Sequence, residues 1–251
     1  MSGHSKWSTI KHKKAITDAR RGKLFTKLSK EIIIAAKQGG GDIDMNFRRR
    51  MAIQIAKDNN MPADNIERAV KRGTGESGDA DSMSEFTYEG YGPGGVGIML
   101  LSLTDNKNRT VSDIRSTLSK AGGNLAETGS VSWQFEEKGV IVVDAVQERA
   151  EELALVAIDA GAEDFETYAD TLHIYSEPSS LDDIRASLSG QDAPISSTDL
   201  SMIPTSTIML EQKQAIQTLR LLDSLEELDD VQKVFSNADF PDTALITFQS
   251  S

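Results

Sequence analysis

The chain has 251 residues, 38% of them hydrophobic, and a formal net charge of -12. It contains no cysteine, which excludes disulfide bonds, thiol nucleophiles and thiolate metal sites. No apolar run reaches the roughly 18 residues of a membrane-spanning helix, so we expect a cytoplasmic protein with no membrane partner.

The net charge conceals an uneven distribution along the chain. Residues 1–75 hold 17 Lys and Arg against 7 Asp and Glu, whereas the remaining residues hold 10 against 32. An asymmetry of this size indicates that the basic part meets a polyanion, while the acidic part maintains solubility or faces another partner.

The basic part is expected to consist of an arm and three helices. Residues 1–16 show no sustained periodicity, whereas apolar spacing and Gly, Asn or Pro boundaries predict helices over 17–41, 46–58 and 62–73. On the first helix the apolar side chains recur on one face and the lysines fall on the opposite face. Short helices joined by such turns are typical of a small helical bundle.

After a Gly-, Ser- and Asp-rich linker at 73–84, the hydrophobic period changes to that of strands. The first group of elements is strand, strand, helix (capped by Thr110), strand, over residues 85–90, 96–103, 110–121 and 130–135. The second group reads βαββαβ, over residues 140–146, 148–160, 164–168, 171–176, 181–188 and 196–202. The tail adds strand, helix and strand over residues 206–212, 213–228 and 231–236.

This element order predicts an α+β fold of three domains. The second group has the split βαβ order of a ferredoxin-like domain, and the tail supplies the elements that the first group lacks. We therefore expect two ferredoxin-like α/β domains, one inserted in the other. The predicted domains are a basic arm and three-helix bundle over 1–75, an α/β domain over 85–137 with 204–249, and the inserted ferredoxin-like domain over 138–203.

The stretch GYGPGG, residues 90–95, matches the glycine spacing of a dinucleotide-binding loop. That fingerprint needs a helix after the loop, but a buried strand follows here, so a strand-connecting loop is favoured over a nucleotide cradle. Its central residues still form a candidate contact loop: Tyr91, Gly92, Pro93 and Gly94.

Nothing in the sequence selects catalytic or metal-binding residues. The only histidines are His4, His12 and His173, and the acidic runs of the second half are typical of solvated helix ends. We therefore expect a protein that is not an enzyme and has no cofactor and no metal.

The basic module carries the candidate nucleic-acid-binding residues. The arm, the lysine face of the first helix, the arginine run at the start of the second and the end of the third concentrate cations in one segment, which is the footprint of nucleic-acid binders. Trp7 either stacks on a base or packs against the bundle. The candidates are Lys6, Trp7, Lys11, His12, Lys13, Lys14, Arg20, Arg21, Lys23, Lys27, Lys30, Arg48, Arg49, Arg50, Lys71 and Arg72.

Several segments resemble the YebC family of bacterial proteins and their mitochondrial relatives. They are GHSKWSTIKHKKAITDARRGKLFTKLSKEI, AAKQGGGD, NNMPADNIERAVKRGTGE, YEGYGPGGVGIM, TDNKNRT and GGNLAETGSVSWQF. The resemblance implies three domains and no catalytic residues. It also implies a probable DNA-binding transcriptional regulator or, as for the mitochondrial relatives, a translation factor that helps the ribosome through consecutive prolines. One departure is Phe47, where the family usually has proline.

The sequence thus predicts a non-enzymatic regulator of gene expression. Two targets stay open: duplex DNA at promoters, and ribosomal RNA or tRNA on the ribosome. Two rivals of other classes are an enzyme with a titratable pocket beside residues 90–95 and a protein scaffold that binds through sheet edges. Nothing in the sequence indicates an oligomeric state.

Overall fold

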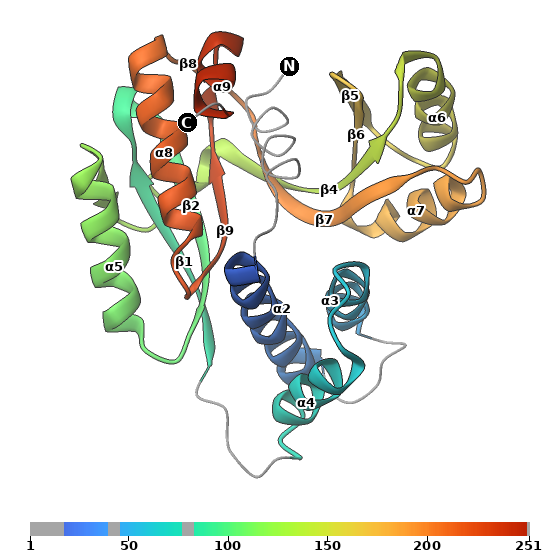
Figure 1. Ribbon diagram of the computed structural model, residues 1–251, viewed down its shortest axis with the longest axis horizontal. Helices are drawn as coiled ribbons and strands as arrows, with labels where there is room; N and C mark the ends of the chain where they lie inside the picture. The colour runs from blue at the N-terminus through green and yellow to red at the C-terminus, as the bar shows by residue number, and fades with distance from the viewer. Residues whose placement is uncertain (1–17, 40–45, 77–82, 250–251) are drawn as a thin grey trace.

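The computed structural model describes residues 18–39, 46–76 and 83–249 (Figure 1). The predicted arm, with the candidates from Lys6 to Lys14, lies outside the described residues.

The N-terminal helices confirm the three predicted from periodicity. They are α2 (Asp18–Gly39), α3 (Phe47–Asp58) and α4 (Ala63–Gly73). Asn46 caps α3, since its side chain accepts a hydrogen bond from the Arg49 N–H at 3.0 Å. Helix α2 packs against both neighbours, with Ile32 and Ile33 in the shared core.

The first sheet joins strands from two distant parts of the chain. Its strands are β1 (Ser84–Tyr91), β2 (Gly97–Thr104), β3 (Asn124–Ala126) and β9 (Val231–Ser236), in the order β3-β1-β2-β9, and all neighbours are antiparallel. Helices α5 (Lys107–Lys120) and α8 (Gln212–Glu226) cover one face (Figure 1). Asn106, not Thr110 as expected, caps α5, and its side chain accepts from the Arg109 N–H.

Two expectations about this region are wrong, and one helix was not expected. Residues 130–135 are not a strand, because η2 (Ser132–Gln134) is a 3-10 helix. Of residues 206–212 only β8 (Ile208–Met209) is extended, and it pairs with β10 (Ala238–Asp239) in a separate two-stranded sheet. A further helix, α9 (Asp242–Gln249), packs on α8 where no element was expected.

The second sheet has the predicted βαββαβ order. Its elements are β4 (Phe135–Asp144), α6 (Gln147–Asp159), β5 (Asp164–Tyr168), β6 (Thr171–Ser176), η3 (Pro178–Ser180), α7 (Leu181–Ser189) and β7 (Ile195–Pro204). The antiparallel strands lie in the order β5-β6-β4-β7, with α6 and α7 packed on one face. The α+β class is confirmed, while the domain boundaries stay a prediction.

Helix α2 is buried on two sides and lies between its helical neighbours and the first sheet (Figure 1). Ile33 packs among the helices, whereas the next residue, Ile34, packs with Met83 and with Leu103 of β2. The lysine-bearing side of α2 therefore approaches the turn between α8 and β9, more than 190 residues further along the chain.

Candidate nucleic-acid interface

Three α2 lysines that the sequence analysis assigned to nucleic acid, Lys23, Lys27 and Lys30, contact the α8–β9 turn, residues 226–230. Lys23 Nζ donates to both the backbone carbonyl and the carboxylate Oε2 of Glu227, each at 3.0 Å. Lys27 Nζ donates to the Glu226 carbonyl at 2.5 Å. The predicted cationic face thus exists, and its described contacts are with the acidic part of the same chain.

Lys30, further along the same face of α2, contacts a buried carboxylate. Its Nζ donates to Asp230 Oδ1 at 2.9 Å, and Arg109 Nη2 and Thr110 Oγ1 donate to Asp230 Oδ2 at 2.8 and 2.9 Å. Burial disfavours the charge of Asp230, but the hydrogen bonds from Lys30, Arg109 and Thr110 outweigh it, so the pKa of this carboxyl is lowered. Asp230 therefore joins α2, α5 and β9 electrostatically.

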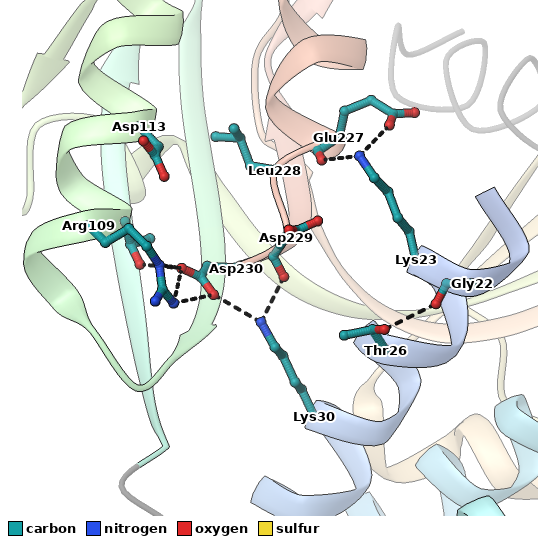
Figure 2. A pocket seen from close by; sticks show the side chains of 11 residues that line it. Gly22, Lys23, Thr26, Lys30, Arg109, Asp113, Glu227, Leu228, Asp229 and Asp230 are labelled. Atoms are coloured by element: carbon teal, nitrogen blue, oxygen red, sulfur yellow. Dashed lines mark hydrogen bonds and ion pairs between the residues drawn. The ribbon is translucent and has the colours of Figure 1, made fainter. Parts of the chain in front are cut away.

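A pocket of about 860 Å³ lies between these three elements (Figure 2). Cations from α2 and α5 and acids from the turn line it, and Figure 2 shows Lys23, Lys30 and Arg109 directed at acceptors of the turn. None of residues 90–95 contributes to its wall. The pocket is therefore not the one that the enzyme hypothesis expects, and its paired charges hold neighbouring elements together.

The arginine run of α3 is also engaged within the protein. Arg48 forms ion pairs with Glu31 at 2.8 Å and with Glu85 at 2.7 Å, which ties α3 to α2 and to β1. Partial burial disfavours the Arg48 charge, yet these two carboxylates raise its pKa overall. Arg49 is buried, and Arg50 lies 3.8 Å from Asp182 of α7.

Exposed cations of the basic module include residues at the start of α2 and along α4. Arg21, Lys71 and Arg72 are exposed, and so is Arg68, which the sequence analysis missed. Lys71 pairs with Glu67 one turn earlier at 2.6 Å. Arg20 belongs to α2, but its side chain lies outside the described part.

The loop at 90–95 connects β1 to β2 through η1 (Pro93–Gly95), which confirms a strand-connecting loop. Gly94 has φ +79, and a Cβ there would lie 2.5 Å from Leu210 Cδ2, so the backbone conformation and the packing both favour glycine here. Tyr91 is half-buried, and its hydroxyl donates to the Ser130 carbonyl at 3.0 Å. Gly92 is buried and Gly94 is the exposed member of the four, and the contact loop of Tyr91, Gly92, Pro93 and Gly94 stays a prediction.

The exposed aromatic residue near this loop is Trp133, which the sequence analysis read as part of a strand. Its side chain is 73% exposed, and Nε1 donates to the same Ser130 carbonyl at 3.1 Å. The Thr, Gly and Ser residues that precede Trp133, in the stretch TGSVSW, are the sequence pattern that could have predicted a turn here.

A buried carboxylate holds the Trp133 loop in place. Glu89, 3% exposed on β1, accepts hydrogen bonds from the backbone N–H groups of Gly129, Val131 and Ser132 at 2.8, 2.6 and 3.0 Å. Burial raises the pKa of a carboxyl, but these amides outweigh burial here and the pKa of Glu89 is lowered.

The described residues hold neither a cluster suited to a metal ion nor a helix that could span a membrane. In that part of the chain no three His, Asp or Glu side chains gather as a metal site, and His173 is buried on β6. No described helix is both long and apolar enough to cross a membrane.

The fold and the charged surface define a class of protein in which a basic helical module precedes two α/β sheets. Residues 5–76 match the family described as "TACO1/YebC protein N-terminal domain", and residues 83–238 match "TACO1/YebC second and third domain". The chain belongs to the TACO1/YebC family.

Relatives align over almost the entire chain. A probable transcriptional regulatory protein of Dehalococcoides mccartyi is 55% identical, over 96% of this chain and 95% of its own length. One from Natranaerobius thermophilus is 50% identical, over 98% of this chain and 100% of its own length. The crystal structure of a conserved hypothetical protein from Aquifex aeolicus is 46% identical, has a TM-score of 0.86, and covers 94% of this chain and 97% of its own.

Proposed function

We propose that the protein is a non-enzymatic, cytoplasmic regulator of gene expression that binds nucleic acid through residues 1–75. The observation that carries the proposal is the charge division, 17 basic against 7 acidic residues in this module and 10 against 32 elsewhere. A DNA-binding role also agrees with the names of the relatives, which are probable transcriptional regulatory proteins.

The contacts of the described cations divide them into two groups. The Lys30–Asp230 pair has side chains that are 15% and 8% exposed, so this lysine holds the domains together. The Lys23–Glu227 pair is 46% and 42% exposed, so water and salt screen it and a phosphate can replace the carboxylate. We therefore assign the polyanion contacts to Lys23 and to the exposed Arg21, Lys71 and Arg72, together with the arm.

Lys27, Arg48, Arg49 and Arg50 belong with the structural group in this proposal. Their described contacts or their burial fix helices against the rest of the chain. Basic groups that grip phosphates position a protein on its polymer without reading base sequence. Binding is therefore expected to be driven by counterion release and to show little sequence preference.

Anisotropy titrations of fluorescein-labelled duplex DNA and of labelled tRNA test the proposal. With six to ten phosphate contacts, affinity should fall about 10³- to 10⁵-fold between 50 and 200 mM salt. Replacing Arg21, Lys71 and Arg72 by Gln should weaken binding and reduce the salt slope by about one for each lost phosphate contact. Lys213→Gln, an exposed lysine on α8, is the matched control. Absence of salt-dependent binding to both polymers would refute the proposal.

The acidic composition beyond residue 75 favours a second candidate, a ribosome-associated translation factor that binds ribosomal RNA or tRNA and relieves stalling at proline-rich stretches. An acidic body is repelled by a bare duplex but can face basic ribosomal proteins. Co-sedimentation with ribosomes over a salt series, compared with a promoter-fragment shift assay, separates the two. Retention on ribosomes without a promoter shift assigns the translation role.

A further inference from the structure

Helix α6 and strand β5 carry a group of exposed apolar side chains on the second sheet. Leu155 is 68% exposed, Ile158 is 40% exposed and Phe165 is 41% exposed. Leu155 and Ile158 are three residues apart on α6, so they lie on the same side of the helix. We call these three residues the α6–β5 patch.

The strand register places Phe165 on the helix-covered face of the sheet. Phe165 lies opposite Ile174 of β6, and Ile174 belongs to the core that α6 and α7 cover. The connection from α6 to β5 is tight, because the N–H of Gly161 bonds to the Ile158 carbonyl at 3.0 Å. Phe165 therefore adds an exposed apolar side chain at the edge of the sheet, on the same face that α6 covers.

Acidic side chains surround the patch. Glu151, Glu152 and Asp159 occupy the helix positions one turn before and after Leu155, and all three are exposed. The nearby cations are compensated, since Arg149 pairs with Glu152 and Lys138 pairs with Glu163 at 2.9 Å. An apolar centre with this rim repels nucleic acid and anionic lipid, and it complements a surface that is both apolar and basic.

The edge of β5 favours a helix over an added strand as the occupant. Among the described strands β5 pairs only with β6, but the Phe165 N–H already bonds to Asp164 Oδ1 at 2.8 Å. This local hydrogen bond and the neighbouring acids make the edge of β5 less able to pair with an added strand. An amphipathic helix needs no such pairing, because it binds through side chains at i, i+3, i+4 and i+7.

We propose that the α6–β5 patch is a docking site for a basic amphipathic helix of a protein partner. Leu155 and Phe165 are the apolar anchors, and the exposed Glu151 and Asp159 meet lysines or arginines that flank the partner's apolar stripe. The site goes beyond the proposed nucleic-acid function, because it lies outside residues 1–75 and binds a cationic partner, whereas the basic module binds an anionic one.

A designed peptide of Leu and Lys at amphipathic helical spacing, fluorescein-labelled, is the probe, with the same peptide carrying Glu in place of Lys as its counterpart. The full-length protein is expected to bind the Lys peptide more weakly as salt rises, and not to bind the Glu peptide. Leu155→Ser with Phe165→Ser should weaken binding at least about tenfold, as expected for removal of interface anchors. Met209→Ser is the matched control, because Met209 is 65% exposed on β8, outside the patch.

Thermal melts of all variants and sedimentation velocity complete the experiment. The substituted side chains are substantially exposed, so the melting temperatures should match that of the parent protein. Equal loss of peptide binding in Met209→Ser, or unchanged binding in the Leu155/Phe165 variant, overturns the proposal. A concentration-dependent dimer that Leu155→Ser abolishes also overturns it, because the occupant is then a second copy of this chain.

Discussion

Lys30 and Asp230, 200 residues apart in the sequence, form an ion pair of 2.9 Å that is largely withdrawn from water. Arg109 and Thr110 donate to the same carboxylate, so one acidic side chain binds a lysine of α2 and two side chains of the first turn of α5. Part of the positive charge of the basic module is therefore paired with acidic groups of the same chain.

Removal of the central carboxylate should be far more damaging than removal of an exposed one. Asp230→Ala leaves Lys30 without its carboxylate partner in a mostly buried site, which should cost roughly 3 kcal/mol of the free energy of unfolding. Glu227→Gln should cost less than about 1 kcal/mol, because the Lys23–Glu227 pair is exposed. Urea denaturation of the two variants at neutral pH provides the comparison. Similar midpoints for both would show that the Asp230 cluster contributes little.

The free energy of unfolding should decrease at acidic pH as Asp230 becomes protonated. Its pKa in the folded protein is lowered from the value of about 3.9 in an unfolded chain. The stabilisation is therefore complete above about pH 5 and is lost as pH falls through the unfolded value toward the folded one. The difference between the urea midpoints of the parent and of Asp230→Asn, measured from pH 6 downward, should begin to shrink near the unfolded value of about 4 and continue to shrink as pH falls further. A difference independent of pH would contradict the assignment.

Glu89 should control the order of the Trp133 loop. Glu89→Gln replaces an acceptor-only carboxylate with an amide whose NH₂ group faces backbone N–H donors, so at least one buried donor loses its partner. We expect a loss of roughly 1–3 kcal/mol. Hydrogen exchange should show faster exchange of the Val131 and Ser132 amides, whereas amides of β6 serve as the internal control. Full protection at Val131 in the variant would show that another contact holds the loop.

Alanine substitutions at two neighbouring glycines should distinguish the stability cost of backbone strain from that of a side-chain collision. Gly94 and Gly95 both have positive φ, but only at Gly94 would a Cβ collide with Leu210. Gly95→Ala should cost about 1–2 kcal/mol from backbone strain alone. Gly94→Ala should cost an additional 1–3 kcal/mol or so from overpacking. Thermal melts that rank the two variants in the reverse order would refute this packing role of Gly94.

Local patterns were sufficient for most of the elements. The helices α3 and α4 begin where Asn46 and Pro62 indicated, and the βαββαβ order of the second sheet followed from alternating periods. The TACO1/YebC membership was also readable from short segments, because their composition is distinctive.

The errors arose where a long-range contact overrides a local pattern. Residues 130–135 alternate as a strand does, but Glu89 takes the N–H groups of Val131 and Ser132 that a ladder would need. The lysine face of α2 was predicted correctly. Its hydrogen-bond acceptors lie in the turn at 226–230, and no sequence pattern near α2 indicates that contact. Periodicity shows which side chains share a face, not what that face meets.

The position of β9 at the edge of the first sheet has a consequence for synthesis. All four strands of the second sheet precede β9 in the chain, so they have been made before the partner of β2 exists. A growing or truncated chain that ends before residue 231 therefore leaves one side of β2 without main-chain partners. Such an open edge attracts other extended chains, so unfinished copies are candidates for chaperone capture or aggregation.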